Sequence, residues 1–338
     1  MQTDIGRAAN DPPIQLATDQ ALVDGVLARR LRPLAKAITL IESQREDHRA
    51  RAQHLLDALL PHTGGAMRVG ISGVPGVGKS TFIEALGLYL IEQGLRVAVL
   101  AVDPSSSLTG GSILGDKTRM ELLSRNPAAF IRPSPAAGSL GGVAEKTREA
   151  MLACEAAGFD VIVVETVGVG QSETAVAGMT DIFCLLQLPN AGDDLQAMKK
   201  GVMELADLIA INKADIDPTA ALAARAQMKT ALHMLRPASP NWTVPVLTLS
   251  ALKQEGVAEF WRTVQDYRAA MTASGEFIAR RRHQTTAWLW ELIDAGLRWR
   301  FRQHPGVKAD LPGLLAAVEA ARTTPAAAAR ELLAHMNG

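Results

Sequence analysis

Residues 73–80 read Gly-Val-Pro-Gly-Val-Gly-Lys-Ser, and this octapeptide restricts the possible folds more than any other feature of the sequence. It follows a short apolar run at residues 67–72 and precedes an amphipathic segment that begins at Lys79. A strand, a glycine-rich turn and a helix in this order match the phosphate-binding pattern G-x-x-x-x-G-K-[ST]. The glycines let backbone N–H groups turn toward a phosphate, and the helix N-terminus adds partial positive charge. The sequence therefore predicts an α/β fold around a nucleotide phosphate site.

Short apolar runs alternate with helical patterns through most of the chain after this motif. Strands are expected at residues 67–72, 96–102, 130–132, 161–165, 182–186, 208–212 and 244–249. Helices are expected at residues 79–93, 116–124, 143–157, 195–205, 218–235 and 256–271. This alternation is typical of a doubly wound, mostly parallel sheet with helices on both faces.

Helical segments flank the predicted sheet domain on both sides, which gives three regions: 1–62, 63–273 and 274–338. Apolar residues recur at helical spacing from Asp19 to about Leu60, and Pro33 is expected to split this arm into separate helices. The last region is helical and carries Trp288, Trp290 and Trp299. These side chains must pack on their own domain or on a second chain. We expect a homodimer interface, because Trp and Arg are enriched at interfaces.

Charge and composition argue against several other classes of protein. Lys+Arg and Asp+Glu are equal at 35 each, and no basic stripe stands out, so we expect no nucleic-acid partner. No apolar run reaches membrane-spanning length, and the N-terminus lacks a signal pattern. The two cysteines, Cys154 and Cys184, are far apart and suggest no disulfide framework. We therefore expect a cytoplasmic protein without a membrane segment.

The phosphate motif assigns roles to individual residues. The Lys79 ammonium can reach the β- and γ-phosphates, and the Ser80 hydroxyl can bind Mg²⁺. The expected phosphate contacts are Gly76, Val77, Gly78, Lys79, Ser80 and Thr81.

A second motif, Asn212-Lys213-Ala214-Asp215, follows the apolar strand at residues 208–211. The Asp215 carboxylate can accept both N–H donors on the Watson–Crick edge of guanine, a pair that adenine does not present. The Asn212 amide can bond guanine N7, and the Lys213 stem can cover the base. A buried carboxylate left unpaired by the wrong base gives strong discrimination. Base support from the other side is expected from Ser250, Ala251 and Leu252.

The strand at residues 161–165 ends in Glu165-Thr166-Val167-Gly168. A carboxylate at the end of a strand beside the phosphate-loop strand can hold Mg²⁺ through water, and Gly168 can offer its N–H to the γ-phosphate. Ras-like GTPases have Asp where this chain has Glu165, which indicates a different branch.

Five stretches together resemble the MeaB family, also named ArgK, within the SIMIBI class of P-loop proteins. They read VDPSS, SILGDKTRM, ETVGVGQSE, LLQLPNAGDDLQAMKKG and INKAD, and the resemblance covers almost the whole chain. It implies a GTPase chaperone that gates cobalamin loading and protection of adenosylcobalamin-dependent methylmalonyl-CoA mutase. The implied ligands are GTP or GDP with Mg²⁺, and the implied partners are the mutase and a second copy of the chain.

The resemblance also implies three nucleotide-sensing segments. Asp103 and Asp116 fall in the first switch, near the metal and the γ-phosphate, and Glu165 and Gly168 fall in the second. Residues 187–200 match a third switch that senses the mutase, with Asp193, Gln196 and Lys199 as its polar contacts. The implied catalytic set is Lys79, Asp103, Asp116, Glu165 and Gly168, and the implied metal set is Ser80, Asp103, Asp116 and Glu165.

The residue that orients the attacking water stays open between Asp116, Asp103 and Gln171. No arginine finger is evident, although Arg119 and Lys117 lie near the first switch, so slow intrinsic turnover is expected. Two other functions compete with the mutase chaperone. One is a metallochaperone GTPase for a nickel or cobalt enzyme, and the other is a small-molecule kinase. The dispersed cysteines and histidines argue against the first, and guanine selectivity argues against the second.

Overall fold

The structure is a computed structural model that describes residues 13–102, 120–133, 140–166, 172–189, 200–235 and 239–337. The chain divides into two compact units, Met1–Phe277 and Ile278–Gly338. The first unit contains a seven-stranded sheet in the order β3-β2-β4-β1-β5-β6-β7, and every strand pairing is parallel. The strands are β1 Met67–Gly73, β2 Val97–Val102, β3 Ala129–Arg132, β4 Val161–Thr166, β5 Ile182–Gln187, β6 Leu208–Ile211 and β7 Val246–Thr248. The doubly wound α/β prediction is confirmed, and the expected strand ends differ from these by at most two residues.

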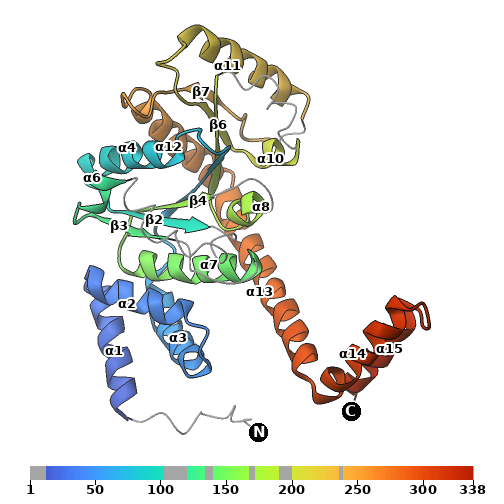
Figure 1. Ribbon diagram of the computed structural model, residues 1–338. Coiled ribbons are helices and arrows are strands. Elements are labelled where there is room, and N and C mark those ends of the chain that lie inside the picture. Colours follow the sequence, from blue (N-terminus) through green and yellow to red (C-terminus); the bar gives the residue numbers. More distant parts are fainter. Residues whose placement is uncertain are drawn as a thin grey trace. The chain divides into compact units, whose positions relative to one another are not determined.

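Helices cover both faces of the sheet, as Figure 1 shows. One face carries α4 (Lys79–Glu92) and α12 (Val257–Ala273), which meet at an edge-to-face contact between Phe82 and Phe260 with ring centroids 4.7 Å apart. The other face carries α7 (Leu140–Ala156) and α8 (Ser172–Ala177). Because side chains alternate along a strand, Val163 joins the core under α4 while Val164 joins the core under α7.

Two further helices of the sheet domain lie toward the β7 edge of the sheet. They are α10 (Lys200–Leu205) and α11 (Pro218–His233), which pack with β5, β6 and β7 around a third, smaller core. A four-residue helix, α6 (Glu121–Ser124), precedes β3 and packs on α4. Residues 116–119 and 195–199, expected to begin two of the helices, lie outside the described part of the chain. Helix α8 was not predicted, because its six residues give too short a pattern to read.

The N-terminal arm forms three helices that pack on α7. They are α1 (Pro13–Leu27), α2 (Leu31–Glu42) and α3 (Glu46–Leu59), followed by a 3₁₀ turn, η1 (Leu60–His62). The expected break near Pro33 occurs at residues 28–30, just ahead of it, because proline fits the first turn of the next helix. A second break at residues 43–45 was not predicted. The Arg51 guanidinium joins Asp19 at 2.7 Å, which ties α3 to α1.

The second unit is helical and small. It contains α13 (Glu276–Gln303, which begins at the end of the first unit), α14 (Pro305–Glu319), α15 (Pro325–Ala334) and the 3₁₀ turn η3 (His335–Asn337). Helices α14 and α15 pack together, and Val307, Ala328 and Leu332 are buried. Within the described residues, no helix is both long enough and apolar enough to cross a membrane.

Candidate functional site

The carboxyl ends of the parallel strands define one edge of the sheet, where the loops that leave them meet. Strand β1, which leads into the phosphate motif, lies between β4 and β5. Strand β6, which leads into the Asn212–Asp215 motif, pairs with β5 on its other side. Motifs more than a hundred residues apart in the sequence are therefore adjacent at this edge.

The phosphate motif forms a tight turn between β1 and α4. Gly76 and Gly78 have φ angles of 79° and 94°, a left-handed region that side chains other than glycine rarely adopt. Helix α4 starts at Lys79, directly after this turn. The Lys79 ammonium donates to the Gly73 carbonyl at 2.7 Å and to the Val74 carbonyl at 3.4 Å. The Lys79 side chain therefore folds back over its own loop.

The Asn212 side chain joins three loops. Its amide Nδ2 donates to the Val77 carbonyl of the phosphate motif at 2.8 Å. Its Oδ1 accepts from the backbone N–H of Lys213 at 2.8 Å and from that of Ala251 at 3.0 Å. Asn212 is 1% exposed. Hydrogen bonds shielded from water are electrostatically stronger, so these three bonds fix the positions of the loops that they join. The sequence suggested only a contact with guanine N7, whereas the structure shows the amide fixing the spacing between the phosphate motif and the base loops.

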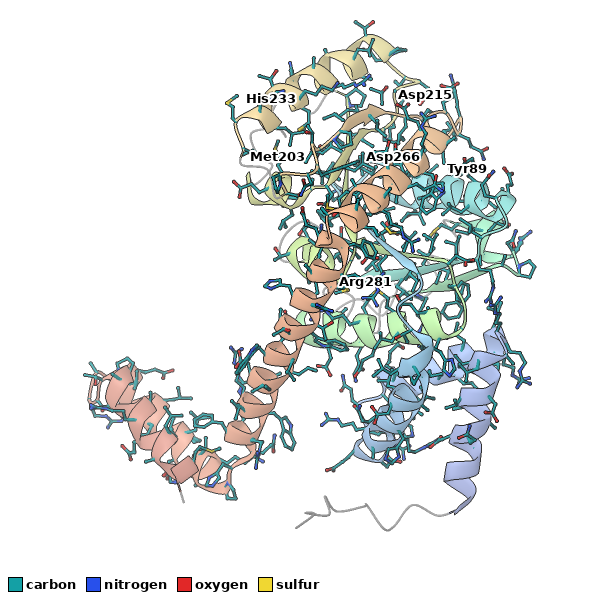
Figure 2. The ribbon with its side chains drawn as sticks, turned by 180° about the vertical axis from the view of Figure 1, so that it is seen from behind. Tyr89, Met203, Asp215, His233, Asp266 and Arg281 are labelled. Carbon is teal, nitrogen blue, oxygen red and sulfur yellow. The ribbon has the colours of Figure 1, made fainter. Side chains whose placement is uncertain are left out.

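The Asp215 carboxylate, predicted to read the base, has a hydrogen-bond partner in the Ser250 loop. Figure 2 labels Asp215 in the loop that precedes α11. A hydrogen bond from the Ser250 side chain holds the pKa of Asp215 below its ordinary value, and the nearby positive charge of Lys253 acts in the same direction. The Ser250 oxygen also accepts from the Lys253 backbone N–H at 3.2 Å. Ala251 is buried, whereas Leu252 is 79% exposed and presents an apolar side chain beside this loop.

The Glu165 carboxylate faces the start of α4. Ser80 Oγ donates to Glu165 Oε1 at 3.4 Å, and Glu165 is 5% exposed. Both groups offer hard oxygen ligands, which suit Mg²⁺, and Mg²⁺ usually keeps several waters besides one or two protein ligands. The pair therefore fits the protein side of a magnesium site next to the phosphate motif.

Several expected site residues lie outside the described part of the chain: Asp103, Asp116, Gly168, Gln171, Asp193, Gln196 and Lys199. Their predicted roles stay predictions. The described strand ends show where the chain enters these segments. Val102 pairs with Thr166 next to Glu165, and β5 ends at Gln187, whose carbonyl accepts from the Asn212 N–H at 2.8 Å.

Sequence reasoning missed two buried hydroxyls at this edge, those of Ser72 and Thr166. The Thr166 hydroxyl donates to Ser72 Oγ at 2.9 Å, between the ends of β4 and β1. The available signal was a hydroxyl residue at or next to the end of each strand, in the sequences Ile71-Ser72-Gly73 and Glu165-Thr166.

The fold and the joined loops are those of a P-loop nucleotide-binding protein with a guanine-reading motif. The chain belongs to the family described as methylmalonyl-CoA mutase-associated GTPase MeaB, whose family model matches residues 34–305. The protein is therefore a GTPase, as the sequence predicted.

Three relatives illustrate the family. GTPase ArgK of Escherichia coli is 55% identical over 267 residues, which cover 77% of this chain and 81% of the relative. The mitochondrial methylmalonic aciduria type A homolog of Mus musculus is 46% identical over 323 residues, covering 92% of this chain and 78% of the relative. A solved structure described as LAO/AO transport system kinase has a TM-score of 0.77 and 40% identity, and covers 95% of this chain and 98% of that chain.

Proposed function

We propose that this GTPase uses a slow cycle of GTP binding and hydrolysis to gate cobalamin loading and protection of methylmalonyl-CoA mutase. The observation that carries the nucleotide part is the bond between Asn212 and Val77, which sets the base-reading loop at a fixed distance from the phosphate loop. The mutase part is supported by the family description and by the name of the mouse relative.

In the proposed site, the backbone N–H groups around Gly76 to Gly78 and the N-terminus of α4 surround the phosphates. The Lys79 ammonium exchanges the carbonyls of Gly73 and Val74 for β- and γ-phosphate oxygens. The Asp215 carboxylate accepts the two N–H donors of guanine. Its low pKa keeps it ionised at neutral pH, so it is an acceptor throughout the working range.

Ser80 and Glu165 would hold Mg²⁺, Ser80 directly and Glu165 through water. When bound, the metal neutralises charge on the transferred phosphoryl group and links it to the protein. The candidates for orienting the attacking water remain Asp103, Asp116 and Gln171. A chain that supplies few groups of its own for the transition state turns over slowly until a partner completes the site.

Partner sensing is assigned to the segment that leaves β5, with Asp193, Gln196 and Lys199 as contacts. Strand β5 pairs with β1 up to Leu186 and Gly73, so the segment departs beside the first residue of the phosphate loop. Loss of the γ-phosphate there can change what the segment presents to a partner. A coupling free energy of about 1–3 kcal/mol is the usual range for such a linkage.

The test is GTP turnover with and without saturating mutase. Lys79→Ala should lose productive GTP binding or turnover in both conditions, because its charge offsets that of the phosphates. Asp193→Ala, Gln196→Ala and Lys199→Ala should keep intrinsic turnover and lose the stimulation by mutase. If their intrinsic turnover falls as far as the stimulated rate, the segment belongs to the catalytic site and the switch assignment is wrong.

The same preparation separates the competing functions. A small-molecule kinase would transfer the labelled γ-phosphate to an acceptor instead of releasing it to water, and a metallochaperone would bind nickel or cobalt ions stoichiometrically. Release of phosphate to water, a preference for GTP over ATP and stimulation by mutase together favour the proposed function.

A further inference from the structure

We infer that the hydrogen bond between Thr166 and Ser72 positions the Glu165 carboxylate against the phosphate loop, so that these two hydroxyls are positioning residues for GTP hydrolysis. This inference rests on the proposed role of Glu165 at the metal. No substrate or metal contact is assigned to either hydroxyl. Their role is to fix the distance between two strands that carry groups which do make such contacts.

The bond between Thr166 and Ser72 lies just past the last backbone pair of β1 and β4. Strands β1 and β4 pair in register as far as Ile71 and Glu165. The next residues, Ser72 and Thr166, lie beyond that last ladder pair, and their side chains continue the connection at 2.9 Å. The bond therefore joins β1 and β4 at the point where β1 leads into the phosphate loop and β4 ends after Glu165.

Each partner of the bond adjoins a group with a proposed role. Ser72 precedes Gly73, whose carbonyl holds the Lys79 ammonium at 2.7 Å. Thr166 follows Glu165, whose carboxylate accepts from Ser80 Oγ at 3.4 Å. Thr166 also pairs through its backbone with Val102, the last residue of β2. Thr166 thus connects two neighbouring strands: its side chain bonds Ser72 near the end of β1, and its backbone pairs with Val102 at the end of β2.

Both hydroxyl side chains are buried. Ser72 is 1% exposed and Thr166 is 0% exposed, and most residues of the strands around them are buried and apolar. A buried hydroxyl pair contributes only modestly to stability, and an apolar pair of similar shape can be equally stable. Directional bonding is what the hydroxyls add at this place, because a hydrogen bond fixes separation and orientation where apolar contacts allow sliding.

The consequence should appear in the metal dependence of the reaction. Mg²⁺ demands nearly ideal octahedral geometry, so a small displacement of an oxygen ligand or of the water it holds weakens binding. Loss of the Thr166–Ser72 bond should raise the Mg²⁺ concentration for half-maximal GTP turnover by about 3- to 10-fold, the equivalent of one hydrogen bond.

The experiment is a Mg²⁺ titration with the full chain, read out both by GTP turnover at saturating GTP and by the affinity for a non-hydrolysable GTP analogue. Thr166→Val keeps the shape and removes the hydroxyl, and Ser72→Ala removes the same bond from the other side. Both should shift the titration, and the double variant should shift it no further than the larger single effect, because all three lack one and the same bond. Thr166→Ser keeps a hydroxyl and should restore the wild-type titration to within about twofold.

Thr147→Val is the matched control. Thr147 is also a buried threonine, 3% exposed, and its hydroxyl donates to the Val143 carbonyl at 2.9 Å within α7, a helix that carries none of the proposed site residues. It should leave the Mg²⁺ titration unchanged even if it lowers the melting temperature. If Thr166→Val and Ser72→Ala lower the melting temperature in the same way and leave the titration unchanged, the hydroxyls are structural only and the inference is wrong.

Glu165→Gln separates failure of this inference from failure of the proposed metal site. If Glu165→Gln raises the Mg²⁺ requirement and Thr166→Val does not, only the positioning role is refuted. If Glu165→Gln leaves the Mg²⁺ requirement unchanged, the metal role of Glu165 is wrong and the positioning inference falls with it. Should Thr166→Val fail to fold, Ser72→Ala and Thr166→Ser still decide the question.

Discussion

At the scale of single residues, Asn212 and Asp215 of the proposed base-reading motif make different kinds of contact. The Asn212 amide bonds only within the protein in these contacts: its nitrogen donates to Val77, and its oxygen accepts from Lys213 and Ala251. Asp215 instead accepts from Ser250 and keeps a carboxylate oriented at the loop surface. An amide bonds well in both directions and suits the internal joint, whereas an anion suits the pair of N–H donors on guanine.

Asp215→Asn should change base preference from guanine toward xanthine. Xanthine has a carbonyl where guanine has its amino group, so an amide can donate to it. We expect GTP affinity to fall by about 10- to 100-fold and XTP affinity to rise relative to GTP. Competition binding with both nucleotides measures the change. Asp217→Asn is the control, because Asp217 caps α11 through Ala220 at 2.9 Å, a role that Asn fills equally well. An unchanged XTP-to-GTP ratio would mean that Asp215 does not read the base.

Ser250→Ala should move the acid limit of nucleotide binding to higher pH. The Ser250 hydrogen bond is the largest cause of the lowered pKa of Asp215, so its removal raises that pKa toward the ordinary value. The ionised carboxylate binds guanine, so affinity is complete above the pKa and is lost as the pH falls through it. GDP binding measured from about pH 6 down to about pH 3 should show the variant losing affinity first. Coincident profiles would contradict the assigned hydrogen bond.

At the scale of secondary structure, α4 organises one face of the site. Its first turn carries Lys79 and Ser80, and its next turns hold α6 in place. The Glu84 carboxylate accepts from the backbone N–H groups of Leu122 at 2.8 Å and Leu123 at 3.3 Å. Gly87 leaves room for the Leu123 side chain, because a Cβ there would lie 2.7 Å from Leu123 Cδ2. The phosphate-loop helix α4 is thus fixed to α6, the short helix that precedes β3.

Glu84→Ala should loosen α6 while Glu84→Gln should not. Alanine removes both bonds to the α6 backbone, whereas Gln keeps a side-chain oxygen that can accept them. We expect a loss of about 0.5–2 kcal/mol in the free energy of unfolding for Glu84→Ala, the usual cost of a lost helix cap. Denaturant unfolding measures it, and hydrogen exchange at Leu122 and Leu123 should quicken in the same variant. Equal stability of the Ala and Gln variants would show that the carboxylate does not cap α6.

At the scale of the whole molecule, helix α13 leaves large apolar side chains uncovered. No residue of this 28-residue helix is buried. Its exposed apolar residues recur at spacings of three and four, so they share one side of the helix: Leu289, Leu292, Ile293 and Leu297, with Trp290 and Trp299 beside them. A patch of this kind marks an interaction surface, and we propose a second copy of the chain as its occupant.

Full-length protein should therefore sediment as a dimer at micromolar concentration. A chain that ends at Gly275, or the double variant Trp290→Glu with Trp299→Glu, should run as a monomer, because charges placed in an apolar interface are left without partners. Leu122→Glu is the control. Leu122 is 64% exposed, comparable with 60% for Trp290, but lies in the first unit and should leave the dimer intact. A monomeric full-length chain would rule out the dimer proposal.

The sequence by itself determined the sheet, its strand pattern and the two nucleotide motifs. Those features are local: a strand's apolar run, the left-handed glycines before Lys79 and the carboxylate at Asp215 are set by residues close together in the chain. Each motif was also predicted to follow directly after an apolar strand, and both do.

The tertiary structure alone decided which side chains join these elements. Asn212 reaches Val77 across 135 positions, Thr166 reaches Ser72 across 94, and Glu84 reaches Leu122 across 38. A hydrogen bond between distant residues depends on strand order, register and the packing of helices. The residues next to either partner in the sequence do not predict these features. The sequence could predict which groups contact a nucleotide, but only the fold showed which distant side chains hold those groups in place.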